Sequence, residues 1–396
     1  MITDSEGQLI WQGPSGTASD MRVQSINGTK YMTYWQGNSS AAFGNAYGAV
    51  HILDNTYTEV NTICLDDVYF QTTNNFTYPC NVDMHEHEVT DHGSIVATAY
   101  NVTRHDLNSV GGPLEGWILE SQFYDVDLAT GKILFGWKSL DHLDTMPLNQ
   151  SQEPLSLYGH PTGLTQSLPW EYFHVNSFQP VSDGYILNAR HYWKVIKIKN
   201  DGCVDWQLQG FNNHSDFNIL DDDAHFKWEH HVRATNITED SMVISMHNNF
   251  NSEVNNGTGP TTGLELAVDT ANRTVTLLKR LIKEYDQYGK AVCTARFGYD
   301  STVTSYRAFS VEGWEGKPAT EPKVAIESKA KGTAVYASWN GATDYDGWVA
   351  YAGSLWSDFS MQKMVARQGF ETEIQLQGNF RERGRCYLTV APWSRE

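Results

Sequence analysis

Imidazole, amide and guanidinium side chains stand at the ends of apolar strand patterns in residues 171–206. The alternating apolar residues there predict two or three short strands joined by Asp-Gly turns. His174 and Asn176 fall at the start of this pattern, and Arg190 falls at the end of its middle strand. The interior of a sheet does not need such groups, so they are candidates for chemistry.

A second stretch, residues 226–247, repeats the arrangement. His230, His231 and Arg233 come first, and an apolar strand pattern follows that ends at His247. A single histidine is usually a satisfied surface or core residue, but repetition at matching positions raises the weight of the set. We expect the two stretches to meet in space.

Three chemical uses are open to these side chains. His230 could take a transferred group on a ring nitrogen while Arg190, His174 and Asn176 hold anionic oxygens. The same four groups could instead polarise a carbonyl or phenolate by hydrogen bonding, without a covalent step. The third use is metal ligation, since several imidazoles suit zinc, copper or iron.

Metal ligation is the weakest of the three. His85 and His87 have the spacing of a ligand pair, and strand alternation is expected to place both on one face and Glu86 on the other. The neighbours of the remaining histidines are amide and guanidinium groups, and a guanidinium beside a metal is unusual. We therefore predict a site without metal or cofactor.

Aromatic residues adjoin the polar groups and are expected to form a flat slot for an aromatic or terpenoid small molecule. The predicted substrate contacts are Trp35, Tyr47, His85, His87, Tyr172, Trp193, Trp228, His231, His247 and Asn248.

The elements that must position these groups are strands. Helical periodicity is nearly absent, and a strand, turn, strand unit recurs, with the turn at Asp127–Gly131 as its clearest example. Units of four short strands that recur at about 40 to 50 residues are typical of a β-propeller, whose functional groups lie where the blades converge. A large β-sandwich is the nearest rival, but it does not explain the recurring turn.

The sequence pattern changes after Phe309. Lys317-Pro318 resembles a linker, and four strand patterns follow it. We predict an all-β protein with a β-propeller at residues 1–316. Residues 317–396 are predicted to form a small β module or the closing strands of the propeller.

Charge excludes several kinds of partner. The 396 residues include 28 Lys and Arg against 47 Asp and Glu, a formal net charge of −19. A phosphate backbone and an anionic membrane surface are therefore unsuitable partners. No apolar run approaches the roughly 20 residues of a membrane span, and we expect a soluble chain.

Cysteines and sequons favour the secretory pathway, lumenal or secreted. The five cysteines include Cys64 and Cys80, which bracket a short loop that one disulfide could close. An odd number leaves one thiol unpaired or joining two copies, so a homodimer stays open. Asn-X-Ser/Thr glycosylation sites occur at Asn27, Asn38, Asn75, Asn101, Asn149, Asn213, Asn236, Asn256 and Asn272.

Several motifs resemble those of a known family. They are TYWQG at 33–37, GNAYGAVHILDNTY at 44–57, DMHEHEVT at 83–90, YDVDLATGKILFGW at 124–137, YFHVNS at 172–177, ILNARHYW at 186–193, WEHHVR at 228–233 and YASWNGATDYDGW at 336–348. In this order they resemble the fungal branch of the arylsulfotransferase-like six-bladed propellers, over nearly the whole chain.

The resemblance implies roles for individual residues. In bacterial members a histidine in a Trp-Gln-His context accepts the sulfuryl group, and His230 matches it, with Glu229 in place of Gln. The His-x-Asn and Arg-His pairs of the family match His174, Asn176 and Arg190. The run 247–249, His-Asn-Asn, replaces a Phe-Asp-Asn type run.

The resemblance also implies a choice of reactions. Some glycosylated fungal propellers of this type are hetero-Diels–Alderases, which join a tropolone-type ortho-quinone methide to a humulene-type sesquiterpene. That reaction needs shape, an aromatic slot and hydrogen bonds to the heterodiene oxygen. The cycloaddition ranks first, sulfuryl transfer from an aryl sulfate second, and a non-catalytic propeller that binds a protein or glycan third.

Overall fold

The structure is a computed structural model of the chain. It describes residues 1–40, 44–157, 159–250, 260–281, 307–329, 332–355, 357–377 and 387–394. These residues are strands, turns and short 3₁₀ segments, so the predicted all-β class is confirmed.

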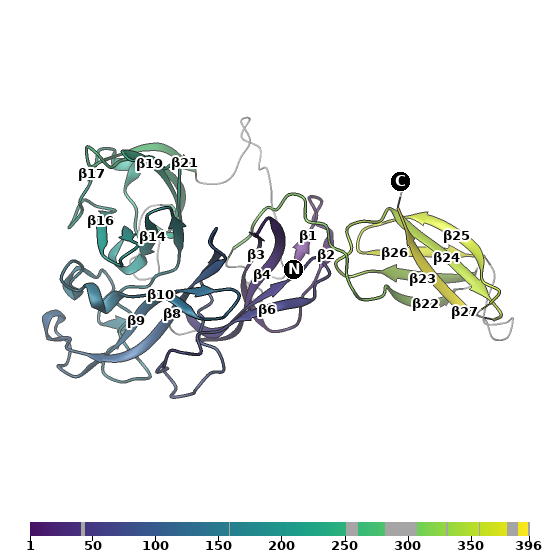
Figure 1. Cartoon of the computed structure of the whole chain (residues 1–396), viewed down its shortest axis with the longest axis horizontal. Helices are drawn as coiled ribbons and strands as arrows, with labels where there is room; N and C mark the ends of the chain where they lie inside the picture. Colours follow the sequence, from purple (N-terminus) through teal and green to yellow (C-terminus); the bar gives the residue numbers. More distant parts are fainter. Residues whose placement is uncertain are drawn as a thin grey trace.

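Four antiparallel sheets follow one another along the chain (Figure 1), each with its strands in sequence order. The first sheet contains β3 (Thr17–Ile26), β4 (Thr29–Ser40), β5 (Asn45–Leu53) and β6 (Glu59–Ile63). The second contains β7 (His87–Val89), β8 (Ser94–His105), β9 (Gly116–Asp127) and β10 (Ile133–Lys138). The third contains β13 (Phe178–Val181), β14 (Gly184–Ala189), β15 (Lys194–Lys199) and β16 (Val204–Gln209).

The fourth sheet has the same meander and one additional edge strand. It contains β18 (His230–Thr235), β19 (Ser241–Asn248), β20 (Thr262–Asp269) and β21 (Thr274–Leu281), with β17 (Asn218–Ile219) parallel to β21. The shorter elements are β1 (Ile2–Thr3), β2 (Leu9–Trp11), β11 (Ser156–Leu157), β12 (His160–Pro161), η1 (Asn108–Val110), η2 (Ser139–His142), η3 (Leu148–Gln150), η4 (Arg190–Tyr192) and η5 (Asp222–Ala224).

The recurring turn has a local cause. After β9, the Asp127 carboxylate accepts hydrogen bonds from the amide and hydroxyl of Thr130 at 2.7 and 2.6 Å, and Gly131 adopts φ 70°. After β20, Asp269 accepts in the same way from the amide of Asn272 at 2.8 Å. Side chains of Asp and Thr that bond to nearby backbone reverse the chain without help from distant contacts.

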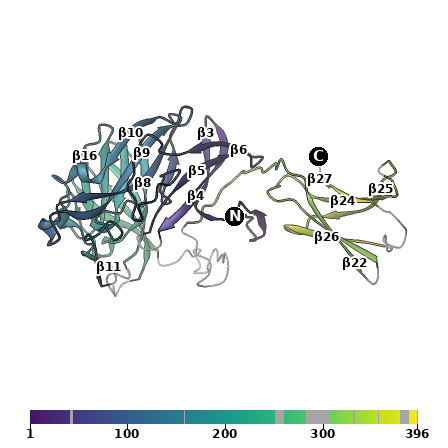
Figure 2. The same ribbon diagram turned by 90° about the horizontal axis from the view of Figure 1, so that it is seen from below.

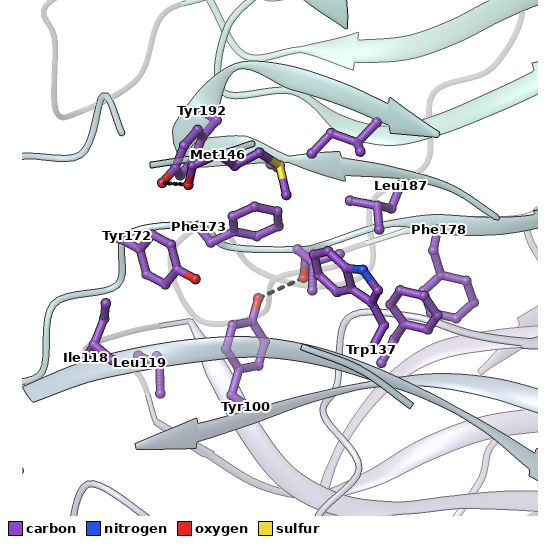
Figure 3. Packing of buried hydrophobic residues seen from close by; sticks show 14 of the residues in the cluster. Tyr100, Ile118, Leu119, Trp137, Met146, Tyr172, Phe173, Phe178, Leu187 and Tyr192 are labelled. Carbon is purple, nitrogen blue, oxygen red and sulfur yellow. Dashed lines mark hydrogen bonds between the residues drawn. The ribbon is translucent and has the colours of Figure 1, made fainter. Parts of the chain in front are cut away.

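Apolar cores fill the spaces between successive sheets. The largest lies between the second and third sheets and contains Phe123, Trp137 and Phe178, all buried, with the Phe123 and Trp137 rings stacked at 5.6 Å. In Figure 3, Tyr100 points from β8 across this core, and its hydroxyl donates to the Val175 carbonyl at 2.7 Å. Face-to-face packing of consecutive meanders is the packing of propeller blades.

A buried ion cluster joins parts of the chain that are far apart in sequence. The Glu86 carboxylate, just before β7, forms ion pairs with Arg22 of β3, Arg233 of β18 and Arg307. Asp20 pairs with Arg22 at 3.0 Å and with Arg307 at 3.2 Å. The first strands of the first, second and fourth sheets therefore converge on one place.

The C-terminal strands form two three-stranded sheets with a core of their own. One sheet has the order β22 (Lys323–Lys329), β23 (Gly332–Ser338), β26 (Glu371–Leu376), and the other β25 (Ser360–Ala366), β24 (Gly347–Gly353), β27 (Tyr387–Trp393). Trp348 is fully buried in the core. Both views place this pair of sheets beside the four larger ones (Figure 1 and Figure 2).

The expectations on cysteine pairing, membrane spans and assembly have different outcomes. The Cys64–Cys80 disulfide is present, Cys203 is exposed and unpaired, and Cys293 and Cys386 lie outside the described residues. Among the described residues no helix is long and apolar enough to cross a membrane. The blade number, the boundary at Lys317 and the homodimer stay predictions.

Candidate functional site

The segments that carry the site have backbones in sparsely populated conformations. His174 lies four residues before β13 with φ 56°, and Trp228 lies two residues before β18 with φ 55°. Side chains with a Cβ rarely adopt this left-handed region, and such strain collects at functional sites. Both residues are therefore held by their surroundings at the entry of a sheet.

Three imidazoles of the site share one feature, a hydrogen bond between Nδ1 and a side-chain oxygen. The pairs, each at 2.6 Å, are His85 with Asp83, His174 with Glu171, and His230 with Asn249. A hydrogen bond at Nδ1 fixes the orientation of the ring. Because an amide oxygen only accepts, His230 carries its proton on Nδ1 and its lone pair on Nε2.

The rings of the site come from three sheets and gather around His174. The centroid of the His174 ring lies 4.9 Å from that of His85, 5.0 Å from that of His191 and 6.5 Å from that of His230. The two sequence stretches therefore meet as expected, and residues before β7 join them.

Arg190 adds a cation beside these rings. Its guanidinium lies 5.1 Å from the centre of the Trp228 ring and donates to His191 Nε2 at 2.7 Å. His191 Nδ1 in turn donates to the Glu171 carbonyl at 2.5 Å. Stacking on an aromatic face and a bond to a neutral imidazole hold the guanidinium in one direction.

Asn176 acts on the backbone next to His230. Its Nδ2 and that of Asn188 donate to the Glu229 carbonyl at 3.0 and 2.9 Å. Arg307 donates to the Asn176 carbonyl at 2.8 Å, which connects this region to the ion cluster. Asn176 thus positions the entry to β18, and its contact with substrate oxygens stays a prediction.

Burial controls the protonation of the site. It lowers the pKa of His230 to about 3, with the Arg190 charge as a second cause, and lowers the pKa of His174 well below its usual value. It raises the pKa of Glu171 and of Glu229 well above the usual range. At neutral pH His230 and His174 are therefore neutral, and Glu229 is a neutral acid that brings no negative charge beside His230.

One group has the residue types of a metal site. Ligand atoms of Glu171, His174 and His191 lie within 4.8 Å of one another. His191 Nε2 already accepts from Arg190, however, and His174 Nδ1 is bonded to Glu171. A metal would have to displace a guanidinium, so this hydrogen-bonded arrangement does not favour a metal centre.

Three predicted histidine contacts, His87, His231 and His247, fall outside the ring contacts around His174. β7 begins only at His87, so His85 and His87 do not share a strand face as expected. The His87 ring is buried against Asp20 and Thr33, at the ion cluster. His231 and His247 line a separate cavity of about 270 Å³ on the fourth sheet.

The other predicted contacts are divided between packing and the site. Trp35 and Tyr172 are fully buried in cores, where the Trp35 indole donates to the Val82 carbonyl and the Tyr172 hydroxyl to Ser139. Asn248 accepts from the Lys227 amide at 3.1 Å and so holds the turn before Trp228.

Three predicted aromatic contacts remain close to the imidazoles, and one of them, Trp228, packs edge-on against His191 at 5.7 Å. Trp193 packs edge-on against Trp228 at 5.4 Å, one ring away from Arg190. Tyr47 is buried at the start of β5, next to Ala46, whose amide donates to the Asp83 carboxylate.

Most predicted glycosylation sites of the described chain are exposed. Asn101 is half-buried on β8, and Asn256 lies outside the described residues. The exposed sites are Asn27, Asn38, Asn75, Asn149, Asn213, Asn236 and Asn272. Their glycosylation stays a prediction.

Sequence reasoning missed the partners of the rings. Asp83, Glu171 and His191 were not singled out, and neither was Glu153, whose Oε2 lies 3.8 Å from His191 Nε2. The spacings Asp-x-His and Glu-x-x-His are short enough to have suggested the first two pairs. Glu153 had no such signal, because only the fold brings it near residue 191.

The structure thus combines an all-β chain with a buried cluster of imidazoles at the entries to its sheets and a guanidinium stacked beside them. The comparisons name the family: the arylsulfotransferase (ASST) family model matches residues 22–298, and the chain belongs to this family. No curated protein matches the chain. Among solved structures, a glycoside hydrolase family 43 arabinoxylan arabinofuranohydrolase from Bacillus subtilis in complex with cellotetraose is similar at 10% identity and a TM-score of 0.30. That match covers 99% of this chain and 79% of the other, and its low score carries no argument.

Proposed function

We propose that the chain is an aryl sulfotransferase in which His230 accepts the sulfuryl group. The observation that carries the proposal is the bond from His230 Nδ1 to Asn249, because it places the imidazole lone pair on Nε2. The low pKa of about 3 keeps this imidazole neutral, and hence nucleophilic, at physiological pH. Membership of the arylsulfotransferase family supports the same reaction.

The reaction balances in two steps. His230 Nε2 forms a bond to sulfur as the ester S–O bond of an aryl sulfate breaks and the phenolate leaves. The oxygen of a second phenol then attacks sulfur, the N–S bond breaks, and its electron pair returns to Nε2. Over the cycle the proton of the acceptor hydroxyl ends on the departing phenol, and Arg190 faces the sulfuryl oxygens.

Intact-protein mass spectrometry with p-nitrophenyl sulfate tests the proposal. We expect nitrophenol release and a mass gain of one SO₃ group on the peptide that holds His230. His230→Ala should abolish both signals, whereas His92→Ala, on an exposed turn between β7 and β8, should change neither. Nitrophenol release that survives in His230→Ala would refute the assignment of His230 as the nucleophile.

A second candidate is the hetero-Diels–Alder cycloaddition between a tropolone-type ortho-quinone methide and a humulene-type sesquiterpene. It is favoured by the aromatic groups at the site, with Trp228 under Arg190 and Trp193 against Trp228. The cycloaddition forms no covalent bond to His230, whose ring only lines the site and accepts at Nε2, so His230→Ala should lower its rate by about 10²-fold or less, the usual effect of losing one polar group at a transition state. Retained product formation from these two substrates without a sulfuryl adduct would favour the cycloaddition.

We also propose that the protein works in the secretory pathway. The nine sequons and the Cys64–Cys80 disulfide support this location. Treatment of the natively produced protein with an N-glycosidase should lower its mass. An unchanged mass would remove the support that the sequons provide.

A further inference from the structure

The loop between β6 and β7 carries aromatic side chains and is held in one conformation. The Cys64–Cys80 disulfide closes it, and Phe70 is buried in the core between the first two sheets. The Gln71 amide donates to Asn101 at 2.8 Å. The loop is therefore a structured surface and not a free connection.

Three rings of this region form a continuous series. Tyr47, which is buried on β5, stacks on Tyr78 with centroids 4.8 Å apart and an interplanar angle of 11°. Phe76 meets Tyr78 edge-on at 4.9 Å and is 57% exposed. We call Tyr47, Tyr78 and Phe76 the aromatic wall.

Hydrogen bonds hold the outer part of the aromatic wall. Asn74 Nδ2 donates to the Tyr78 hydroxyl at 2.9 Å, and Asn74 Oδ1 accepts from the Phe76 amide at 3.1 Å. The Thr72 hydroxyl donates to the Phe76 carbonyl at 2.8 Å. An exposed phenylalanine that is fixed in this way keeps its ring available to a ligand at little cost in conformational entropy.

The aromatic wall begins beside the imidazoles. The amide of Ala46, next to Tyr47, donates to Asp83 at 2.8 Å, and Asp83 holds His85. A Cβ placed on Gly44 would lie 3.9 Å from the His174 ring. The start of β5 is therefore bonded to Asp83, the partner of His85, and the residue before β5 passes close to the His174 ring.

We propose that the aromatic wall binds the ring of the aryl substrate whose reacting oxygen faces His230. Aromatic rings attract one another in stacked or edge-on pairs, and both geometries already occur between the three rings. The rings present flat apolar faces, while Arg190 supplies the charge for the sulfuryl end. The inference rests on the proposed function, because it assigns the other end of the same substrate.

Binding of 2-naphthol to the full chain, measured by titration calorimetry without a sulfate ester, tests the inference. We expect Phe76→Ala and Tyr78→Leu each to weaken 2-naphthol binding about 3- to 10-fold. Tyr69→Ala is the matched control, because Tyr69 lies in the same loop and is 85% exposed. Decahydro-2-naphthol, which has the same outline without aromatic rings, should bind less tightly to the unmodified chain and lose little in the variants.

Equal weakening by Tyr69→Ala, or unchanged 2-naphthol binding in both wall variants, would overturn the proposal. If Tyr78→Leu disturbs the loop, Phe76→Ala still decides the question, because the Phe76 side chain is mostly exposed. The assay needs no turnover. If the two wall variants bind 2-naphthol more weakly as expected but the unmodified chain transfers no sulfuryl group, only the proposed function is refuted. If the unmodified chain transfers the sulfuryl group but the wall variants bind 2-naphthol as it does, only the role of the aromatic wall is refuted.

Discussion

At the scale of single residues, the site depends on which nitrogen of each ring is engaged. Asn249 accepts from His230, whereas Asp83 and Glu171 are bonded to His85 and His174. The amide oxygen of Asn249 only accepts, so it fixes the proton of His230 on Nδ1, whereas a buried carboxyl group with a raised pKa, such as Glu171, can itself donate to the ring. His230 is therefore the ring best suited to act as a nucleophile and poorly suited to act as a base.

Asn249→Ala should lower the rate of sulfuryl transfer by about 10²-fold, because misplacement of a nucleophile by 1 Å costs about that much. The thermal stability should change little, since Asn249 lies after β19 on a partly buried segment. ¹⁵N NMR of the histidine side chains checks the cause directly, with the His230 proton expected on Nδ1 in the unmodified chain. A proton on Nε2 there would contradict the assigned tautomer.

Glu153 gives the site a pH-dependent cost in stability. Burial raises its pKa to about 7, with the Arg190 charge acting in the opposite direction. Between the unfolded value near 4.3 and the folded value, the native state holds a proton that the unfolded chain has lost. Stability therefore falls as the pH rises through this window, by at most about 4 kcal/mol.

Glu153→Gln should remove that fall. We expect the variant to gain stability relative to the unmodified chain between pH 5 and pH 8, as measured by urea denaturation at each pH. Glu239→Gln, on an exposed turn, serves as the control and should leave the pH dependence unchanged. A constant difference between the Glu153 variant and the unmodified chain at all pH values would contradict the raised pKa.

At the scale of elements, close backbone approach in the first sheet needs glycine. Gly37 and Gly48 are cross-strand partners on β4 and β5, and the Trp35 ring lies over them. A Cβ on Gly48 would lie 2.3 Å from the Gln36 carbonyl oxygen and 2.7 Å from the Trp35 ring. The Gly48 amide also bonds to Val82, so this pair helps to place the segment that leads to Asp83.

Gly48→Ala should destabilise the protein by about 1–3 kcal/mol, the usual cost of overpacking a filled core. Gly263→Ala is a matched control in β20, because its nearest neighbour would lie 3.6 Å away, at an ordinary contact distance. Chemical denaturation followed by near-UV circular dichroism measures both variants. Equal stability of the two variants would show that the first sheet can relax around the new methyl group.

At the scale of the whole molecule, the ion cluster joins the first, second and fourth sheets. The side chains of Asp20, Arg22, Glu86 and Arg307 are at least nine-tenths buried. Burial of ions is costly, so such a group is maintained only when every charge is compensated. The cluster therefore specifies how the sheets meet more than it adds to stability.

Glu86→Gln should destabilise the protein by about 3–5 kcal/mol, because it leaves Arg22, Arg233 and Arg307 with one carboxylate fewer in a buried place. Glu327→Gln is the control, since Glu327 is exposed in the C-terminal sheets and its partners, Lys329 and the Tyr336 hydroxyl, contact it at the surface. The midpoint of thermal unfolding measures both. A loss no larger than that of the control would mean that water reaches the cluster.

The sequence by itself determined the class of the fold, the strand and turn units and the Cys64–Cys80 pair, because these follow from alternation, local Asp turns and short spacing. It also identified His174, Arg190 and His230 as candidates. Only the tertiary structure decided that His85 joins them while His87 belongs to the ion cluster, since β7 begins at His87 and leaves His85 outside the strand. The same holds for Glu153 and for the aromatic wall, whose members meet through contacts between sheets. Local patterns carry no information on such contacts until the sheets are packed against one another.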